Sequence, residues 1–259
     1  MVRDLEELGR LADENLLGTW VGQGRHAGTV DGFGGCSFVV TGIPAAFFNG
    51  VFSAGPVDDP DAAIGAAITF MAEHAVPWLL WVRDGVDDEL LAAGRRAGLA
   101  DAGGPPAMAL PIIDDIPAPP SELLIEMVDD AEGLAVFRDL SARGFEMPVE
   151  FVEMLIADSM IDDPAFAVVV GSVDGVPASC AMVSVTGTTA GIYNVATPAE
   201  FRRRGYGEAA TWAAIEAGAQ RGCDHAVLQA SEMGAPVYRR MGFVDVGRYV
   251  QLEGAAPAS

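Results

Sequence analysis

The residues with the clearest chemical potential form one short segment, Arg202-Arg203-Arg204-Gly205-Tyr206-Gly207. A β-type run, Ile192 to Thr197, precedes it and a helix-forming run, Glu208 to Gln220, follows it, so the segment is a turn from strand to helix. The first N–H groups of a helix lack intrahelical partners, and the helix dipole adds positive charge there. The glycines let a ligand approach the backbone, and the arginines add charge-assisted hydrogen bonds. The segment therefore predicts a phosphate site, although a solvated arginine cluster at a helix start explains the turn alone equally well.

Two motifs in the second half of the chain follow one another in a recognisable order. The first is R-x-x-G-x-G, formed by Arg202, Gly205 and Gly207, and the second is Tyr238-Arg239-Arg240-Met241-Gly242-Phe243. Together they resemble the acetyl-CoA pyrophosphate loop and the Y-x-x-x-G-F signature of the GCN5-related N-acetyltransferases (GNAT). Val195-Ala196-Thr197-Pro198 is similar to the preceding strand of that family, whose backbone pairs with the pantetheine arm. The resemblance covers residues 123–252.

The resemblance implies both a fold and an activity. The fold is an α/β arrangement in which a mixed, mostly antiparallel central sheet is flanked by helices. The activity is direct transfer of an acetyl group from acetyl-CoA to a primary amine in a ternary complex, and the chain has no metal-ligand spacing. The residues that the resemblance assigns to the acetyl-CoA site are Val195, Ala196, Thr197, Arg202, Arg203, Arg204, Gly205, Tyr206, Gly207, Glu208, Ser231 and Tyr238.

Two groups are the catalytic candidates. By the resemblance, the backbone N–H of Val195 donates to the tetrahedral oxyanion, and one such donor is worth about 3–4 kcal/mol in a dry site. Tyr238 is the candidate general acid, because its ordinary pKa of about 10 is close to the value of about 8.5 for a thiol. The alternative is a structural role for Tyr238, in which the ring packs in the core and the hydroxyl only forms a hydrogen bond.

No residue is identified as the general base. Many family members place a glutamate on or near the cofactor strand, where this chain has Tyr193 and Asn194. A chain of water molecules could carry the proton to bulk solvent instead. Three glutamates are further candidates for the base, although such residues are more commonly solvated surface carboxylates: Glu146, Glu150 and Glu232. His225 precedes a strand and is interpreted as structural, whereas His26 lies in a glycine-rich stretch that could reach the acceptor cleft.

The composition restricts the partners. The 259 residues include 15 basic and 37 acidic side chains, a formal net charge of −22, and every basic side chain is an arginine. An acidic surface repels nucleic acid and anionic membranes and favours a cationic acceptor such as an amine, although the charge also serves solubility alone. No apolar run has the length of a membrane span, and the acidic start MVRDLEELGR is unlike a secretory signal. The scattered cysteines, Cys36, Cys180 and Cys223, favour a reducing cytoplasm and buried positions.

The hydrophobic pattern predicts the elements that position these residues. Leu5 to Leu17 predicts a helix, and the glycine-rich Thr19 to Phe33 predicts a loop. Further strands are expected at 37–41, 46–53, 78–83, 107–112, 123–128, 166–173, 176–185, 192–197, 226–230 and 243–252, and helices at 61–74, 87–97, 131–142, 149–160, 208–220 and 235–241. The proline-rich segment 114–121 predicts a linker between two domains, residues 1–113 and 122–259.

The order strand, helix, strand, helix, strand occurs once before the linker and once after it, which predicts two copies of one fold. In the first copy, Gly55-Pro56-Val57-Asp58-Asp59-Pro60 has no arginine and no G-x-G, and its aspartates would repel a pyrophosphate. Gly94 stands at the place of Tyr238. We therefore expect residues 1–113 to be a degenerate GNAT-like domain without cofactor, with a structural role or as one wall of the acceptor cleft. An unrelated α/β domain is the alternative.

These observations favour an N-acetyltransferase that acts on a small-molecule or protein amine, as a monomer or a homodimer. A non-catalytic acyl-CoA-binding sensor is the alternative, because the cofactor strand lacks a base, although Tyr238 argues against it. A purely structural protein would bind no CoA at all.

Overall fold

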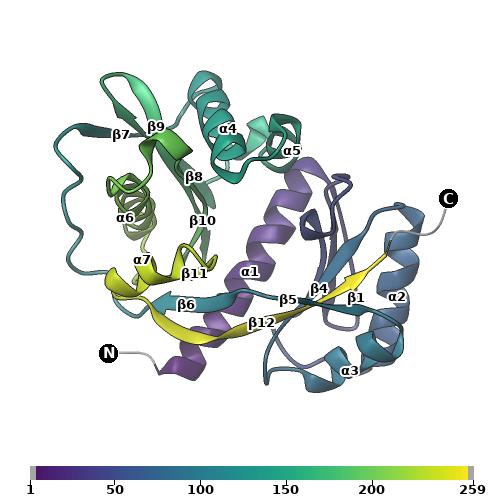
Figure 1. Ribbon diagram of the computed structural model, residues 1–259. Coiled ribbons are helices and arrows are strands. Elements are labelled where there is room, and N and C mark those ends of the chain that lie inside the picture. The colour runs from purple at the N-terminus through teal and green to yellow at the C-terminus, as the bar shows by residue number, and fades with distance from the viewer. Residues whose placement is uncertain (1–3, 256–259) are drawn as a thin grey trace.

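The computed structural model, shown in Figure 1, describes residues 4–255. The first half of the chain is a long helix followed by strands that alternate with shorter helices. In chain order its elements are α1 (Leu5–Ala27), β1 (Thr29–Phe33), β2 (Cys36–Val40), the 3-10 turn η1 (Ala46–Phe48), β3 (Asn49–Phe52), α2 (Pro60–Glu73), β4 (Trp78–Arg83), α3 (Asp88–Arg96), β5 (Ala100–Gly103) and β6 (Pro106–Leu110).

The second half begins with an edge strand and two helices before its long central strands. Its elements are β7 (Leu123–Met127), α4 (Ala131–Phe145), α5 (Val149–Leu155), η2 (Asp158–Met160), β8 (Phe166–Val173), β9 (Val176–Thr186), β10 (Thr189–Ala196), η3 (Ala199–Phe201), α6 (Tyr206–Ala219), β11 (His225–Gln229), α7 (Ala235–Arg240) and β12 (Val244–Gly254).

All of these strands belong to one mixed sheet. The 12-stranded sheet has the order β1-β2-β3-β4-β12-β6-β11-β10-β9-β8-β7, and β5 pairs with β12 beside this path. In Figure 1, α2 and α3 lie in one lobe and α4, α5, α6 and α7 in the other, while α1 crosses between the lobes. The predicted α/β class with a mixed sheet flanked by helices is confirmed.

The repeat predicted from the sequence is present in the strand pairing. In the first half β2 pairs antiparallel with β3, and β3 pairs parallel with β4. In the second half β9 pairs antiparallel with β10, and β10 pairs parallel with β11. Each parallel pair is linked through a helix, α2 or α6. The molecule therefore contains two units of the same topology.

The two units share their last strands. Strand β12 pairs through Tyr249–Gly254 with β4 of the first half, and through Val244–Arg248 with β6. Strand β6 in turn pairs with β11 of the second half. Figure 1 shows β12 running along both lobes beside β5 and β6. The division at residues 113 and 122 stays a prediction, and each unit completes its sheet with a strand from the other.

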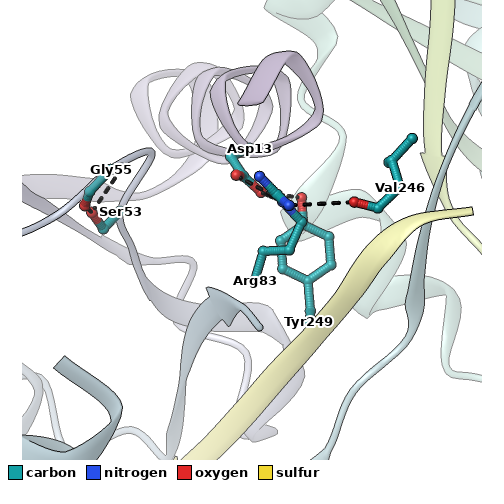
Figure 2. A network of polar contacts seen from close by, with 6 residues as sticks. All are labelled: Asp13, Ser53, Gly55, Arg83, Val246 and Tyr249. Atoms are coloured by element: carbon teal, nitrogen blue, oxygen red, sulfur yellow. Dashed lines mark hydrogen bonds and ion pairs between the residues drawn. The ribbon is translucent and has the colours of Figure 1, made fainter. Parts of the chain in front are cut away.

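A polar cluster, Asp13-Arg83-Tyr249, holds α1 against the shared strand β12 (Figure 2). The Arg83 Nε donates to both carboxylate oxygens of Asp13, at 3.1 and 3.0 Å, and an Arg83 Nη1 donates to the carbonyl of Val246 at 3.3 Å. The Tyr249 hydroxyl donates to Asp13 Oδ1 at 3.0 Å. Only 4% of Asp13 is exposed, and burial raises its pKa to about 6 despite the opposing effect of the guanidinium.

The loop expected over Thr19 to Phe33 is wrong, because α1 and β1 occupy nearly all of that stretch. Its glycines allow close packing rather than a turn. A Cβ on Gly22 would lie 2.8 Å from the ring of Phe166, and a Cβ on Gly24 would lie 2.6 Å from a methyl group of Val30. Such contacts exclude any larger side chain, so the helix needs glycine where it meets the sheet.

Three smaller expectations also differ from the structure. The run 46–53 divides into η1 and β3, because the buried Asn49 side chain donates to Ile43 O and Pro77 O and accepts from the Thr41 N–H. The helix expected over 149–160 ends at Leu155, and β5 was not predicted at all. The hairpin turn at 174–175 is confirmed, with positive φ at both residues, as a type I′ turn requires.

Candidate active site

The central strands of the second unit separate at one point. β10 and β11 are paired only from Thr189 to Gly191, although β10 continues to Ala196. Asn15 of α1 packs against this point so closely that a Cβ on Gly191 would lie 1.8 Å from its Oδ1. The same Oδ1 accepts a hydrogen bond of 2.8 Å from the Tyr193 hydroxyl. Because the ladder stops there, the backbone of β10 beyond Gly191 has a free edge toward β11.

A bulge increases this opening on the other side of β10. Tyr193 pairs with Met182 and Ala196 pairs with Cys180, so two residues between them have no partner in the register with β9. One of the two, Asn194, has a positive φ of 49°. The other is Val195, whose backbone N–H is therefore outside the ladder. The predicted oxyanion donor lies at the most irregular point of the strand.

The arginine turn follows directly and leads into α6. The Arg202 side chain is turned inward, where its Nε donates to Thr197 O at 3.0 Å and its Nη2 donates to Gly144 O at 3.1 Å. Arg203 and Arg204 are exposed, and neither forms an ion pair within the described residues. Of the three arginines expected at the cofactor, two are thus free to bind an anion and one holds the turn to α4.

The start of α6 has the geometry of an anion site. Arg203 and Gly205 have positive φ values of 62° and 81°, so the chain reverses sharply before the helix. The Ala209 N–H bonds to the carbonyl of Gly205 at 2.9 Å, and the helical amides before it have no intrahelical acceptor. A Cβ on Gly207 would lie 3.0 Å from the Oγ1 of Thr197. The predicted backbone site is thus compact and joins the end of β10.

Two side chains in this turn point elsewhere. Tyr206, expected at the cofactor, is only 2% exposed and packs in a cluster with Leu123, Ala178 and Ala209. Its hydroxyl donates to Glu122 Oε1 at 3.2 Å. Glu208 lies at the helix surface, 4.0 Å from the guanidinium of Arg240. Both can still offer backbone N–H groups to a ligand, but their side chains are otherwise engaged.

A cavity of ≈ 320 Å³ adjoins the opening between β10 and β11. Both halves of the chain line it, and the walls are mainly apolar. The lining residues are Leu16, Trp20, Gln23, Phe47, Phe48, Trp81 and Pro105 from the first half, and Ser141, Phe145, Met147, Val152, Leu155, Ile192, Tyr193, Asn194, Val195, Gln229, Ala230, Ser231 and Tyr238 from the second. Three predicted site residues, Val195, Ser231 and Tyr238, are therefore brought together in one cavity.

Tyr238 lies at the cavity wall in α7. Its ring packs at a centroid distance of 5.8 Å from the ring of Phe243. Burial raises the pKa of Tyr238 to about 12, so it keeps its proton at neutral pH. The difference between the pKa of Tyr238 and that of a thiol, which is about 8.5, is thus larger than it would be for an ordinary tyrosine.

None of the candidate bases lines the cavity. Glu146 has a side chain that is 78% exposed and lies 3.7 Å from Arg202, and Glu150 and Glu232 are also exposed. His26 contacts Ser159 and Asp163 at 2.8 Å each, away from the cavity. His225 is buried, with its Nε2 2.8 Å from Thr189 Oγ1, which agrees with a structural role.

The lining residues from the first half were not predicted. Leu16, Trp20 and Gln23 recur at helical spacing on one face of α1, and this periodicity was a usable signal. The glycine-rich composition of Thr19 to Phe33, which predicts a loop, obscures this periodicity. Phe47 and Phe48 carry no motif, and only their position in the fold assigns them to the cavity.

The chain was compared with known proteins. Residues 134–243 match the family model described as Acetyltransferase (GNAT) family, and no curated protein matches the sequence. A GCN5-related N-acetyltransferase from Kribbella flavida is 19% identical over 97% of this chain and 96% of its own, with a TM-score of 0.74. A tandem GNAT protein from the clavulanic acid biosynthesis pathway is 17% identical over 100% and 97%, with a TM-score of 0.63.

The matched segment and these structures show that the fold is that of the GNAT proteins. The match to the GNAT family model is confined to residues 134–243, and the two units in one chain have the same fold as the tandem arrangement of one of the similar structures. A third similar structure, from Sphaerobacter thermophilus, is 15% identical over 85% of this chain and 76% of its own, with a TM-score of 0.59.

Residues 4–255 contain no group of three or more His, Cys, Asp or Glu residues arranged to hold a metal ion. No helix in the same range has the length and apolar character needed to cross a bilayer.

Proposed function

We propose that this protein transfers an acetyl group from acetyl-CoA to a primary amine in a ternary complex. The observation that carries the proposal is the opening of β10 from β11 beyond Gly191, with Tyr238 on its wall and the start of α6 at its end. An extended pantetheine arm could pair with the free backbone edge of β10. The pyrophosphate would then meet the first amides of α6 and the exposed Arg203 and Arg204.

The chemistry follows from these positions. The amine nitrogen attacks the thioester carbonyl, a C–N bond forms, and the Val195 N–H donates to the oxyanion. The C–S bond then breaks, and Tyr238 donates a hydrogen bond to the departing sulfur. With a pKa of about 12, Tyr238 is better suited to stabilise the thiolate than to lose its proton outright. The proton released by nitrogen goes to water, and the thiolate finally takes a proton from water.

The first experiment is a thermal unfolding scan with and without acetyl-CoA. Ligand at about a hundredfold over its Kd stabilises the folded state by about 2.7 kcal/mol, which raises Tm by several degrees. The double variant Arg203→Ala/Arg204→Ala should lose most of this rise without a lower Tm of its own, because neither side chain forms an ion pair with any residue in the range 4–255.

The control for that experiment is Arg95→Ala/Arg96→Ala at the end of α3. It removes two exposed arginines from the first half, each paired with a surface aspartate. It should leave the acetyl-CoA shift unchanged. An equal loss in both double variants would mean that overall charge, rather than the α6 turn, governs the effect.

A non-catalytic acyl-CoA sensor is the second candidate function. One observation favours it, namely that no carboxylate or imidazole among the described residues lines the cavity. A sensor would show the acetyl-CoA shift without release of CoA in the presence of any amine. Measurement of free thiol over a panel of amines therefore separates the two functions.

A further inference from the structure

The cavity is lined without charge. Among the described residues, none of those that line it is acidic, basic or histidine. The Asp13-Arg83-Tyr249 cluster (Figure 2) contributes no residue to this lining, and its carboxylate and guanidinium pair with each other at 3.0 Å. Tyr249 contacts the cavity residue Trp81, with 5.8 Å between the two ring centroids. The strong negative charge of the chain therefore does not extend into the cavity.

Aromatic rings of the first half build one wall. Phe47 lies at 6.1 Å from Trp20 and 5.8 Å from Trp81, edge to face in both cases, and 5.4 Å from Phe48. This arrangement, which we call the aromatic wall, has Phe47 at its rim with 51% of the residue exposed. The lining from the second half includes further apolar side chains, namely Phe145, Met147, Val152 and Leu155. A lining of this kind suits an apolar ring.

The first half also provides a donor without a partner. The indole N–H of Trp81 is buried and has no hydrogen-bond partner among the described residues. The same holds for the amide nitrogen Nε2 of Gln229, which belongs to another lining residue. Both atoms are donors, so neither can accept a proton from an ammonium group. Because neither atom has exposed surface, neither adds a counter-charge or a base to the cavity.

An alkyl ammonium would enter this cavity at a high cost. Contact of an ammonium with aromatic ring faces is only weakly favourable. It contributes less than the cost of burying a charge without a counter-ion, and the lining residues provide neither a carboxylate to pair with it nor a base to take its proton. An alkyl amine with a pKa of about 10.4 is almost wholly ammonium at neutral pH. An aromatic amine, in contrast, is uncharged at neutral pH because its lone pair is delocalised into the ring.

We infer that the acceptor is an uncharged primary aromatic amine whose ring lies against the aromatic wall. This inference rests on the proposed acetyl transfer. It also accounts for a cavity lining that, among residues 4–255, contains no carboxylate or imidazole, since a neutral arylamine can attack without prior deprotonation. In the balanced reaction the arylamine nitrogen forms the C–N bond and loses one proton to water, the C–S bond breaks, and the sulfur leaves as thiolate and gains one proton from water. The degenerate first unit then has a definite task, because it supplies the ring-binding wall.

The test compares aniline and 1-naphthylamine with cyclohexylamine, which carries the same amino group on a saturated ring. CoA release and the acetylated product are measured with the full-length protein at neutral pH. The kcat/KM for an arylamine should exceed that for cyclohexylamine by at least about tenfold, because little of the alkyl amine is neutral. Between about pH 7 and pH 9, kcat/KM for cyclohexylamine should rise about tenfold per pH unit, whereas that for aniline stays flat.

A matched pair of variants tests the aromatic wall. Phe47→Ala should raise KM for aniline about tenfold and leave KM for acetyl-CoA unchanged. Phe33→Ala is the control, because Phe33 is also 51% exposed but lies on β1 and does not line this cavity. Equal effects of the two variants on KM for aniline would overturn the assignment of the wall.

The outcomes also separate this inference from the proposed function. If acetyl-CoA raises Tm and cyclohexylamine is acetylated at least as well as the arylamines, the inference is wrong and acetyl transfer stands. Failure of both arylamines to react overturns the inference whatever the alkyl amine does. If acetyl-CoA neither binds nor is consumed, both proposals are wrong.

Discussion

The three consecutive arginines show how identical residues differ in role once they are folded. The guanidinium of Arg202 donates hydrogen bonds to the carbonyls of Thr197 and Gly144, so this side chain fixes the path of the turn. Arg203 and Arg204 remain exposed at the start of α6. A consensus motif alone cannot make this distinction, because it depends on which carbonyls lie nearby in the folded chain.

The first residue prediction concerns Tyr238. Tyr238→Phe removes the hydroxyl but keeps the ring that packs on Phe243, so the fold should be unaffected. If the hydroxyl donates to the departing sulfur, kcat should fall by roughly 10²-fold while KM for acetyl-CoA stays nearly constant. Steady-state kinetics on a reactive amine measure both. An unchanged kcat would remove Tyr238 from the mechanism.

The second residue prediction concerns the buried Asp13. Its pKa is raised from 3.8 to about 6, so the folded protein holds this proton more tightly than the unfolded chain does. Its contribution to stability therefore falls as the pH rises from about 4 to about 7. The Asp13→Asn variant lacks this titration. Over that pH range its free energy of unfolding should therefore rise relative to that of the wild type by on the order of 2–3 kcal/mol.

Denaturant unfolding at several pH values measures the difference. Asp58→Asn, which removes an exposed carboxylate instead, is the control and should show no comparable trend. A constant difference between Asp13→Asn and the wild type across the range would contradict the raised pKa.

At the scale of elements, α1 is the part of the molecule that the second unit depends on most. It belongs to the first half, yet its Asn15 packs against Gly191 and donates to Ser184 O at 3.0 Å. Thr19, one turn later, donates to Asn15 O at 2.8 Å and contacts Ser184 Oγ at 2.9 Å. The opening of β10 from β11 is thus held by a helix from the other half.

The element prediction compares two glycines in helices. Gly24→Ala in α1 would place a Cβ 2.6 Å from Val30 and 2.8 Å from Val39, so it should destabilise the protein by about 1–3 kcal/mol despite the better helix propensity of alanine. Gly65→Ala in α2 meets no atom within 4 Å and should stabilise the protein by about 0.5–1 kcal/mol. Chemical denaturation measures both, and destabilisation by both variants would refute the packing argument.

These elements also show what the sequence could and could not predict. The strand, the turn at 202–207 and the helix after it were predictable because their residue types recur at short spacing, whereas the chemical roles of these residues and of Tyr238 stay predictions. The end of α1 was not, because glycine breaks isolated helices but is required where a helix meets a sheet. Nor could local pattern reveal that the cavity joins both halves. Leu16, Trp20 and Phe48 come together with Tyr193 only through tertiary packing.

For the molecule as a whole, the shared strands predict cooperative unfolding. Because β6 and β12 each complete the sheet of the other half, neither unit keeps its core when the other opens. Thermal unfolding should therefore be a single transition, with calorimetric and van't Hoff enthalpies in agreement. Two resolved transitions would mean that the halves are independent.

A cut in the linker tests the same feature directly. A protease site inserted within 114–119, which lies outside any helix or strand, should be cleaved without separating the two pieces. Size-exclusion chromatography should show one species of unchanged size, and the pieces should part only in denaturant. The uncut insertion protein is the control, and separation in native buffer would contradict the strand exchange.

The position of β12 in the chain has a consequence for synthesis on the ribosome. This strand follows every strand that it pairs with, and its residues 244–254 complete both sheets. Chains usually fold domain by domain from the N-terminus as they emerge. In this protein the edge of β4 that pairs with β12 stays unpaired until the ribosome has synthesised the last strand. The exposed edge is open to mispairing throughout that interval, so a nascent chain stalled before residue 244 should aggregate or recruit chaperones more readily than the released protein.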